Sequence, residues 1–223
     1  MRKIELPKQN KKGKPTISYS QYSLFKSLSS FNLKDEGYKE YVVKYFLGYK
    51  FADKGWAEFG NDVEDYICKR EKSEKFKEEE KKVLNKIEPL GIFQDKFEID
   101  FGDFTLNGII DDRAEDWSKI IDYKTCSLKS LQQYKTDDYT QMDFYAMKAI
   151  EVTGNIPEME VCAVERLGNC YYEGGREVLT VGENIWRVDR CTTQERLELL
   201  KEDLFLVVYQ ISELYKVFLK TNK

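Results

Sequence analysis

The 223-residue sequence contains no histidine. Histidine is the most frequent general base in hydrolases and a frequent zinc ligand, so its absence excludes Ser-His-Asp triads, Cys-His nucleophiles and His-ligated zinc. The patterns GxxxxGKS/T, GxGxxG and GxSxG are also absent, which gives no sign of an intrinsic ATPase, a dinucleotide site or a hydrolase nucleophile elbow. Any catalysis must therefore use carboxylates, Lys, Tyr, Cys or a bound cation.

Cysteine is scarce, and its spacing forms no motif. The chain has five cysteines, at Cys68, Cys126, Cys162, Cys170 and Cys191. An odd number without a CxxC pair argues against a zinc ribbon and against a disulfide framework, and the spacing matches no iron–sulfur motif. We therefore expect reduced thiols, several of them buried, and no iron–sulfur cluster.

Long hydrophobic runs are missing as well. The longest apolar stretch, Leu204–Val208, is far shorter than the roughly 20 residues of a membrane span, and no apolar signal core follows the charged N-terminus. Proline (4) and glycine (13) are too few for a collagen-like or Pro-rich disordered chain. Hydrophobic residues make up 41% and aromatic residues 14%, enough for a sizeable core. We expect a single cytoplasmic domain over residues 1–223 that does not contact a membrane.

Charge of neither sign dominates. Lys and Arg number 36 against 40 Asp and Glu, for a net charge of −4, so the chain as a whole does not resemble a nucleic-acid-binding protein. Residues 1–14 are an exception, because this segment contains six basic residues and only one acidic residue, Glu5. Such a segment can touch phosphates or can be a frayed, solvated terminus. We expect residues 1–16 to form a flexible basic arm.

Hydrophobic periodicity predicts helices that alternate with strands. The predicted helices lie near residues 17–28, 38–49, 60–87 (as one or two), 137–152 and 192–220. The predicted strands lie near residues 92–100, 104–110, 119–124, 159–165 and 185–188. A hairpin is predicted over residues 171–179. Thr192 to Glu195 fits a capping box for the last helix, and the Lys/Glu run 69–82 fits a solvated helix face. The order predicts an α/β layer in which helices cover a central mixed sheet.

Two of the predicted strands carry carboxylates near one end. Asp111 and Asp112 end one strand, and Asp122 stands eleven residues after Asp111 on the next. Because alternate residues of a strand share a face, Asp122 and Lys124 point to one side, while the Tyr123 side chain points to the other and leaves its carbonyl available. Carboxylates beside a Lys suit a hard cation such as Mg²⁺ and the hydrolysis of a phosphate ester.

Three sequence blocks carry a family resemblance. They are Gly108-Ile-Ile-Asp111, Ile120-Ile-Asp122-Tyr-Lys-Thr125 and Gln141-Met-Asp-Phe-Tyr145, on a predicted strand, strand and helix. In this order they resemble the PD-(D/E)XK nuclease core, and more narrowly its RecB-like exonuclease branch, over about residues 60–166. The resemblance implies a restriction-endonuclease-like α-β-β-β-α-β core, with a central mixed sheet flanked by helices and extra helices at both termini.

The resemblance also implies roles for these residues. Asp111, Asp122 and the main-chain carbonyl of Tyr123 would hold Mg²⁺ or Mn²⁺. Lys124 would position or activate the attacking water. Gln141 would reach the site or the DNA backbone from the following helix.

One block departs from the family pattern. RecB-like proteins often carry Gly-x-x-x-His on the helix before the sheet, and the matching segment here is Gly60-Asn-Asp-Val-Glu64. Glu64 would then replace the His as a metal ligand, with Asp65 as the alternative, since a carboxylate is acceptable to Mg²⁺. Tyr145 is a further candidate that either reaches the site or only packs in the core.

Simpler interpretations of the same residues remain open. Asp111 and Asp112 fit an ordinary turn at a strand end, although Asp112 is kept as a further site candidate. Asp122 and Lys124 fit a surface ion pair on an edge strand. Against that, a charged pair beside apolar neighbours is costly unless it serves a site.

The sequence thus predicts a Mg²⁺- or Mn²⁺-dependent exonuclease that hydrolyses DNA phosphodiester bonds in recombination, repair or DNA processing. The expected partners are linear DNA ends, single- or double-stranded, and a recombination protein, and the oligomeric state is open. Two competitors remain. An endonuclease on the same fold would cut a closed DNA circle, and a catalytically silent domain that binds DNA or a partner protein would lack a metal ligand.

Overall fold

A computed structural model describes residues 3–30, 39–49, 55–135, 139–170 and 175–221. The chain forms two compact units, each assembled from separate stretches of sequence. The first unit comprises Met1–Phe51, Lys96–Gly108 and Thr193–Lys223, and the second comprises Ala52–Asp95 and Ile109–Thr192. The single domain expected over residues 1–223 stays a prediction.

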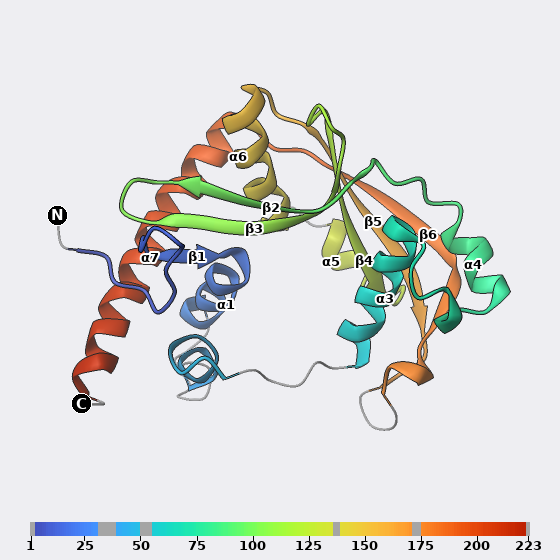
Figure 1. Ribbon diagram of the computed structural model, residues 1–223, viewed down its shortest axis with the longest axis horizontal. Helices are drawn as coiled ribbons and strands as arrows, with labels where there is room; N and C mark the ends of the chain where they lie inside the picture. Colours follow the sequence, from blue (N-terminus) through green and yellow to red (C-terminus); the bar gives the residue numbers. More distant parts are fainter. Residues whose placement is uncertain (1–2, 31–38, 50–54, 136–138, 171–174, 222–223) are drawn as a thin grey trace. The chain divides into compact units, whose positions relative to one another are not determined.

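The second unit is built on strands that bring the sequence blocks together. The end of β3 (Thr105–Arg113) pairs antiparallel with β4 (Lys119–Cys126), which pairs parallel with β5 (Glu158–Leu167). In turn β5 pairs antiparallel with β6 (Thr180–Arg190), and Figure 1 shows β4, β5 and β6 side by side. The mixture of parallel and antiparallel neighbours confirms the central mixed sheet. The first half of β4 is apolar because a central strand is covered on both faces.

Two helices cover one face of these strands. Helix α3 (Gly55–Lys69) packs on β4, and α4 (Glu78–Leu84) packs on β6 after the short 3₁₀ turn η2 (Ser73–Lys75). The sequence predicted one or two helices over residues 60–87, and α3 begins before this range, at Gly55. The apolar stripe of α3 recurs every three or four residues, as expected for a helix with one buried face. It joins Ile121 and Tyr123 of β4 in one core cluster through Phe59, Val63, Tyr66 and Ile67.

Helix α6 (Gln141–Thr153) connects β4 to β5, as the crossover between parallel strands requires. Its first residue, Gln141, donates to Asp122, which points away from the Tyr123 face of β4. Gly154 ends the helix in a left-handed conformation at φ +76°, where its N–H bonds to the Ile150 carbonyl. The short α5 (Gln132–Lys135) precedes α6, and the predicted helix start at residue 137 lies outside the described residues.

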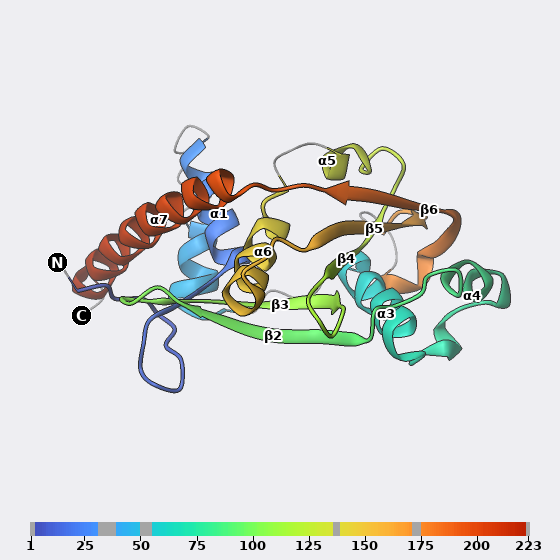
Figure 2. The same ribbon diagram turned by 90° about the horizontal axis from the view of Figure 1, so that it is seen from above.

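The first unit contains the N- and C-terminal elements. Strand β1 (Thr16–Ser18) pairs parallel with the first residues of β3, and α1 (Tyr19–Ser30) packs against the long α7 (Gln194–Thr221). Figure 2 shows α1 alongside α7. Strand β2 (Ile92–Asp100) pairs with β3, and the predicted turn at Gly102 adopts a φ of +85°, so the expected hairpin is confirmed.

The N-terminal residues that the structure describes contact other parts of the first unit, and the flexible basic arm expected over residues 1–16 stays a prediction. The Glu5 N–H donates to Ser212 Oγ at 2.9 Å, and Leu6 is 4% exposed. Lys14 Nζ pairs with Asp100 at 2.6 Å. The segment buries the apolar side chain of Leu6 and leads directly into β1.

Several predicted boundaries also shift. The predicted helix over 38–49 includes the π-helical turn η1 (Val42–Phe46), and residue 38 lies outside the described part. The Lys/Glu run is not one helix face, because Lys72 takes a left-handed φ of +56° and the chain turns through η2. The cap of α7 is Thr193, whose hydroxyl accepts the Arg196 N–H at 3.2 Å, and not Thr192.

The remaining differences concern the C-terminal strands. Strand β6 is longer than the predicted strand over residues 185–188, and residues 171–174 of the predicted hairpin lie outside the described residues. All five cysteines are free, and Cys68, Cys126 and Cys162 are buried, as expected. None of the helices in the described ranges is long and apolar enough to cross a membrane.

Candidate active site

Strands β3 and β4 bring two carboxylates together. Their antiparallel register pairs Asp112 with Ile121, which sets Asp111 beside the next residues of β4. Asp111 Oδ2 accepts the Tyr123 N–H at 2.9 Å. The Asp122 side chain is completely buried and that of Asp111 is 15% exposed. The two sequence blocks therefore deliver their carboxylates to one place, as predicted.

The ammonium group of Lys124 lies among three oxygen atoms. Its Nζ is 2.5 Å from Asp122 Oδ2, 3.7 Å from Asp111 Oδ2 and 3.2 Å from the main-chain oxygen of Tyr123. These are three of the four groups to which the sequence assigns a metal ion. These three oxygen atoms therefore already lie near one positive charge, the ammonium group of Lys124.

Burial and neighbouring charges shift the pKa values of this cluster. Burial raises the pKa of Asp111 well above its usual range, and the Asp122 and Glu64 charges add to the effect while Lys124 opposes it. Burial acts to lower the pKa of Lys124, but the Asp122 and Asp111 carboxylates outweigh it and hold that pKa above its ordinary value. Lys124 is therefore protonated at neutral pH, and the carboxylates would repel each other without a cation between them.

Polar side chains hold Asp122 from the side of α6. Gln141 Nε2 donates to Asp122 Oδ1 at 3.0 Å, and the Tyr139 hydroxyl lies 2.9 Å from Oδ2. Gln141 also donates to the Tyr145 hydroxyl. Burial raises the pKa of Tyr145 well above its usual range, and the Asp122 and Asp111 charges act in the same direction, so the phenol stays neutral. The structure thus brings Gln141 and Tyr145 to the carboxylates.

Glu64 reaches the cluster from α3. Its Oε1 accepts a hydrogen bond from Gln94 Nε2 at 3.2 Å. Burial raises the pKa of Glu64, although the Gln94 hydrogen bond and the Lys124 charge act to lower it. The charges of Asp65 and Asp122 act in the same direction as burial. Glu64 also lines one pocket together with Asp111 and Lys124.

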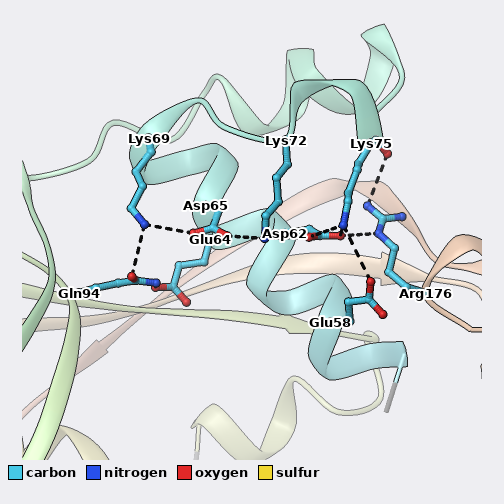
Figure 3. A network of polar contacts seen from close by, with 9 residues as sticks. All are labelled: Glu58, Asp62, Glu64, Asp65, Lys69, Lys72, Lys75, Gln94 and Arg176. Atoms are coloured by element: carbon cyan, nitrogen blue, oxygen red, sulfur yellow. Dashed lines mark hydrogen bonds and ion pairs between the residues drawn. The ribbon is translucent and has the colours of Figure 1, made fainter. Parts of the chain in front are cut away.

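Asp65, the alternative ligand, is engaged elsewhere. Its carboxylate pairs with Lys69 at 3.3 Å and with Lys72 at 2.5 Å. Figure 3 shows Asp65 and Glu64 with different partners, although they are neighbours on one helix. The structure therefore places Glu64, and not Asp65, at the carboxylate cluster.

Asp112 lies on the opposite face of β3 from Asp111. Its carboxylate is fully buried and accepts the Leu90 N–H at 2.7 Å, the Gly91 N–H at 3.1 Å and the Tyr123 hydroxyl at 2.8 Å. These bonds anchor the loop before β2 to the sheet. The structure therefore does not bring Asp112 into the site, because strand alternation turns it into the core.

A pocket of about 490 Å³ opens beside the cluster. Glu64, Asp111 and Lys124 form part of its wall. The helix α3 comes close to β4 here, since a methyl group added at Gly60 would lie 3.5 Å from Thr125 Oγ1. The rest of the wall offers polar and aromatic groups, among them Trp56, Asn61, Gln133, Tyr134 and Arg166. The pocket therefore borders Glu64, Asp111 and Lys124 of the cluster.

The donor set fits a hard divalent cation in kind. Within the described residues, no group of three or more Cys, Asp or Glu side chains converges closely enough to hold a metal ion. Carboxylate and carbonyl oxygens are nevertheless the ligands that Mg²⁺ and Mn²⁺ prefer. Three of these oxygens face the Lys124 ammonium, so the local field favours a positive charge.

Two contacts were not predicted from the sequence. Tyr139 belongs to no motif, and its contact with Asp122 depends on the loop before α6. Gln94 is 30 residues from Glu64 in the sequence, and strand periodicity treats it as an ordinary residue of β2. Both depend on packing between distant segments, which a single sequence does not reveal.

Residues 43–205 match the family model of the PD-(D/E)XK nuclease superfamily. The chain belongs to this superfamily. The match covers all the site residues described above and confirms the resemblance carried by the three sequence blocks. Membership makes the chain a nuclease, a hydrolase that acts on nucleic acid, and nucleases of this superfamily typically use divalent metal ions. No curated protein matches the chain.

A solved structure supports the same fold. The crystal structure of a "Putative exonuclease" from Eubacterium rectale is similar to 89% of this chain and to 81% of its own chain, with a TM-score of 0.52. The sequence identity is 13%, so the likeness shows the fold alone. The restriction-endonuclease-like α/β fold of PD-(D/E)XK nucleases, with a mixed sheet flanked by helices, is thereby confirmed.

Proposed function

We propose that this PD-(D/E)XK nuclease is a RecB-like exonuclease that hydrolyses the phosphodiester bonds of linear DNA with Mg²⁺ or Mn²⁺. The observation that carries the proposal is the contact of the Lys124 ammonium with Asp111, Asp122 and the Tyr123 carbonyl. A phosphodiester needs positive charge at the reacting centre, and this cluster concentrates the groups that supply or bind it. Action in recombination or repair, with a recombination partner, belongs to the same proposal.

Four groups would hold the cation: the carboxylates of Glu64, Asp111 and Asp122 and the main-chain carbonyl of Tyr123. A bound Mg²⁺ or Mn²⁺ would supply Lewis-acid stabilisation of the phosphate and would lower the pKa of a bound water. Burial raises the pKa of Asp111, and the Asp122 charge adds to the rise. A cation between the two carboxylates would relieve their repulsion.

Lys124 has the role of an electrostatic group and not that of a base. The raised pKa of Lys124 keeps its ammonium protonated, so it can donate hydrogen bonds but cannot accept a proton. Hydrolysis forms a bond from the water oxygen to phosphorus and breaks a P–O ester bond. The water releases a proton to solvent, the leaving oxygen takes one up, and negative charge builds on the phosphate oxygens in between. The ammonium orients the water and stabilises this charge.

Gln141 acts by holding Asp122. Its amide donates to Asp122 Oδ1 at 3.0 Å, and the Tyr139 hydroxyl lies near the other carboxylate oxygen. Tyr145 accepts from the same amide and so fixes its orientation. These bonds keep Asp122 directed towards Asp111 and Lys124.

A cleavage assay tests the proposal. The full chain is incubated with end-labelled linear single- and double-stranded DNA and with a covalently closed circle, in Mg²⁺, Mn²⁺ or EDTA. We expect loss of linear DNA with either metal, none in EDTA and an intact circle. Lys124→Ala should lower the rate at least about a hundredfold.

Lys119→Ala is the matched control. It removes a lysine from the same strand, β4, where Lys119 pairs with Glu160 at 3.3 Å outside the carboxylate cluster, and it should keep the wild-type rate. Cutting of the closed circle would instead indicate an endonuclease on this fold. DNA binding without cleavage in any metal would refute the enzymatic proposal and indicate a binding domain.

A further inference from the structure

Gln94 has a backbone conformation that glutamine rarely adopts. It is the third residue of β2, yet its φ is +46°, in the left-handed region that favours glycine and, to a lesser degree, asparagine. A strand interior gives no general reason for this conformation, since neighbouring residues of a strand are extended. Such conformations persist where surrounding contacts require them, often at functional sites.

The Gln94 side chain joins two charged groups of α3. Lys69 Nζ donates to Gln94 Oε1 at 3.3 Å, and Gln94 Nε2 donates to Glu64 Oε1 at 3.2 Å. Figure 3 shows the amide lying between the two side chains. Because an ammonium group can only donate and an ionised carboxylate can only accept, these neighbours fix which end of the amide faces which.

Lys69 is itself held in place. Its Nζ lies 3.3 Å from Asp65 Oδ1, and Asp65 also pairs with Lys72 at 2.5 Å. A chain of contacts therefore runs from Asp65 through Lys69 and Gln94 to Glu64. It starts and ends on adjacent residues of α3, and it separates their carboxylates.

The consequence for Glu64 is electrostatic. Within the described part of the chain, Glu64 forms no ion pair, whereas Asp62 and Asp65 on the same helix are each paired with lysines. A neutral amide can fix a carboxylate by a hydrogen bond without cancelling its charge. Lys69 orients the amide but does not reach Glu64 as an ion-pair partner. The Glu64 carboxylate is thereby held by a hydrogen bond, with no ion pair in the described residues to compete with a cation.

We propose that Gln94 is a positioning residue that orients the Glu64 carboxylate towards the divalent cation of the active site, with Lys69 orienting its amide. This inference rests on the proposed function, in which Glu64 is a metal ligand. Gln94 is outside the carboxylate cluster and acts through Glu64. The left-handed backbone at Gln94 is the conformation that aims its side chain at Glu64.

The test separates the backbone of Gln94 from its amide. Gln94→Gly suits a φ of +46° and removes the amide. Gln94→Asn also tolerates this conformation and keeps an amide, but it is one methylene too short for the contact with Glu64. We expect both variants to unfold at the wild-type urea concentration or higher. We also expect both to bind Mn²⁺ at least about tenfold more weakly, as measured by the electron paramagnetic resonance of free Mn²⁺ without DNA.

Activity gives a second readout. With either variant the Mn²⁺ concentration for half-maximal cleavage should rise about tenfold, and saturating Mn²⁺ should restore the wild-type kcat. A purely structural role would lower stability and would not be rescued by metal. Lys69→Met should shift the Mn²⁺ dependence in the same direction. Unchanged Mn²⁺ affinity in both Gln94 variants would overturn the positioning role.

Glu64→Gln distinguishes the failure of this inference from the failure of the proposed function. If Glu64→Gln leaves Mn²⁺ binding unchanged, Glu64 is not a ligand, and the proposed cation site is wrong in that respect. If it weakens binding while the Gln94 variants do not, only the positioning role fails. In the Glu64→Gln background, Gln94→Gly should cause no further loss, because the two residues act through one contact.

Discussion

Asp111 and Asp112 are adjacent residues with opposite surroundings. Asp111 faces Asp122 and Lys124, whereas Asp112 accepts hydrogen bonds from two backbone amides and the Tyr123 hydroxyl. Strand alternation places Asp111 in the carboxylate cluster and Asp112 in the core. The proposed function gives Asp111 a role in chemistry, whereas the hydrogen bonds of Asp112 stabilise the fold.

Substitution by asparagine should separate these two roles. Asp111→Asn removes a carboxylate that is repelled by Asp122, so the metal-free protein should keep or gain stability while cleavage falls at least about a hundredfold. Asp112→Asn weakens buried charge-assisted hydrogen bonds and should cost about 2 kcal/mol of the free energy of unfolding, with cleavage by the folded fraction retained. Urea unfolding and single-turnover cleavage check both variants. A loss of stability in Asp111→Asn together with a loss of cleavage in Asp112→Asn would contradict these two roles.

At the scale of a secondary-structure element, α3 presents carboxylates to different environments. Glu64 faces the active-site cluster, and Asp62 lies in an ionic network shown in Figure 3. Asp62 is 1% exposed and contacts Arg176 at 2.7 Å, Lys75 at 2.9 Å and Lys72 at 3.2 Å. The network fastens α3 to η2 and to the segment before β6. It thereby supports the helix that carries Glu64.

Removing the Asp62 charge should destabilise the protein in a pH-dependent way. Burial acts to raise the pKa of Asp62, but hydrogen bonds from Arg176, Lys75 and Lys72 outweigh it and hold that pKa below its ordinary value. A depressed acid pKa stabilises the fold above the unfolded-state pKa, and this stability is lost as the pH falls through the folded-state pKa. Asp62→Asn should therefore lower the free energy of unfolding by about 3 kcal/mol at pH 7. The difference from wild type should shrink as the pH falls below about 4.

Glu58→Gln is the control for this prediction. Glu58 lies one turn earlier on α3, is 54% exposed and sits 3.9 Å from the same Lys75. An exposed ion pair of this kind contributes little to stability. The free energy of unfolding of Glu58→Gln should therefore stay within about 0.5 kcal/mol of wild type at pH 7 and at pH 3. Urea unfolding at pH 7 and pH 3 measures both variants. An equal loss for Asp62→Asn at the two pH values would contradict the ionic role of Asp62.

The start of α7 gives a second prediction at this scale. Thr193 caps the helix by accepting the Arg196 N–H at 3.2 Å, so Thr193→Ala should cost about 1 kcal/mol. The Thr192 hydroxyl is buried and has no hydrogen-bond partner among the described residues, so Thr192→Ala should be neutral or stabilising. Thermal unfolding of the two variants compares these neighbours. If Thr192→Ala lost more stability than Thr193→Ala, Thr192 and not Thr193 would be the helix cap.

At the scale of the whole molecule, the candidate site belongs to one unit. Glu64, Asp111, Asp122 and Gln141 all fall within Ala52–Asp95 and Ile109–Thr192, the second unit. Helices α1 and α7 fall in the first unit. A ligand that binds only the folded site stabilises the part of the molecule whose unfolding destroys that site.

Mn²⁺ should therefore protect the two units unequally. At a concentration of about a hundred times its dissociation constant, Mn²⁺ should slow the slowest amide hydrogen exchange in β4 and α3 by roughly a hundredfold. The amides of α1 and α7 should change little, and EDTA should reverse the effect. Hydrogen exchange followed by mass spectrometry measures this. Equal protection of both units would show that they unfold together, and no protection anywhere would contradict a cation site.

The predictable part of the site is the part governed by local geometry. Asp122 and Lys124 were expected on one face of a strand, with Tyr123 on the other, because side chains alternate along any strand. The structure shows Lys124 in contact with Asp122, and the Tyr123 ring in the α3 core. The glycine of the first block has its reason in the pairing of β2 with β3, since a methyl group at Gly108 would lie 2.6 Å from the Phe97 ring.

Other contacts could not be predicted from one sequence. Alternation alone does not tell which of Asp111 and Asp112 faces the site, because either strand face could have been covered by α3. The Gln94 bond to Glu64 joins residues 30 positions apart, and the Arg176 bond to Asp62 joins residues 114 positions apart. Each requires a specific packing of α3 against distant segments.

The sequence by itself determined the order of the main helices and strands and the faces of the central strand, and it predicted a chemistry without histidine that uses carboxylates and Lys124. These follow from backbone periodicity and composition, which are local properties of the chain. Only the tertiary structure decided that the Lys124 ammonium lies between Asp111 and Asp122, that Asp112 is structural and that Gln94 contacts Glu64. Such contacts depend on long-range packing, which sets where side chains from distant elements meet.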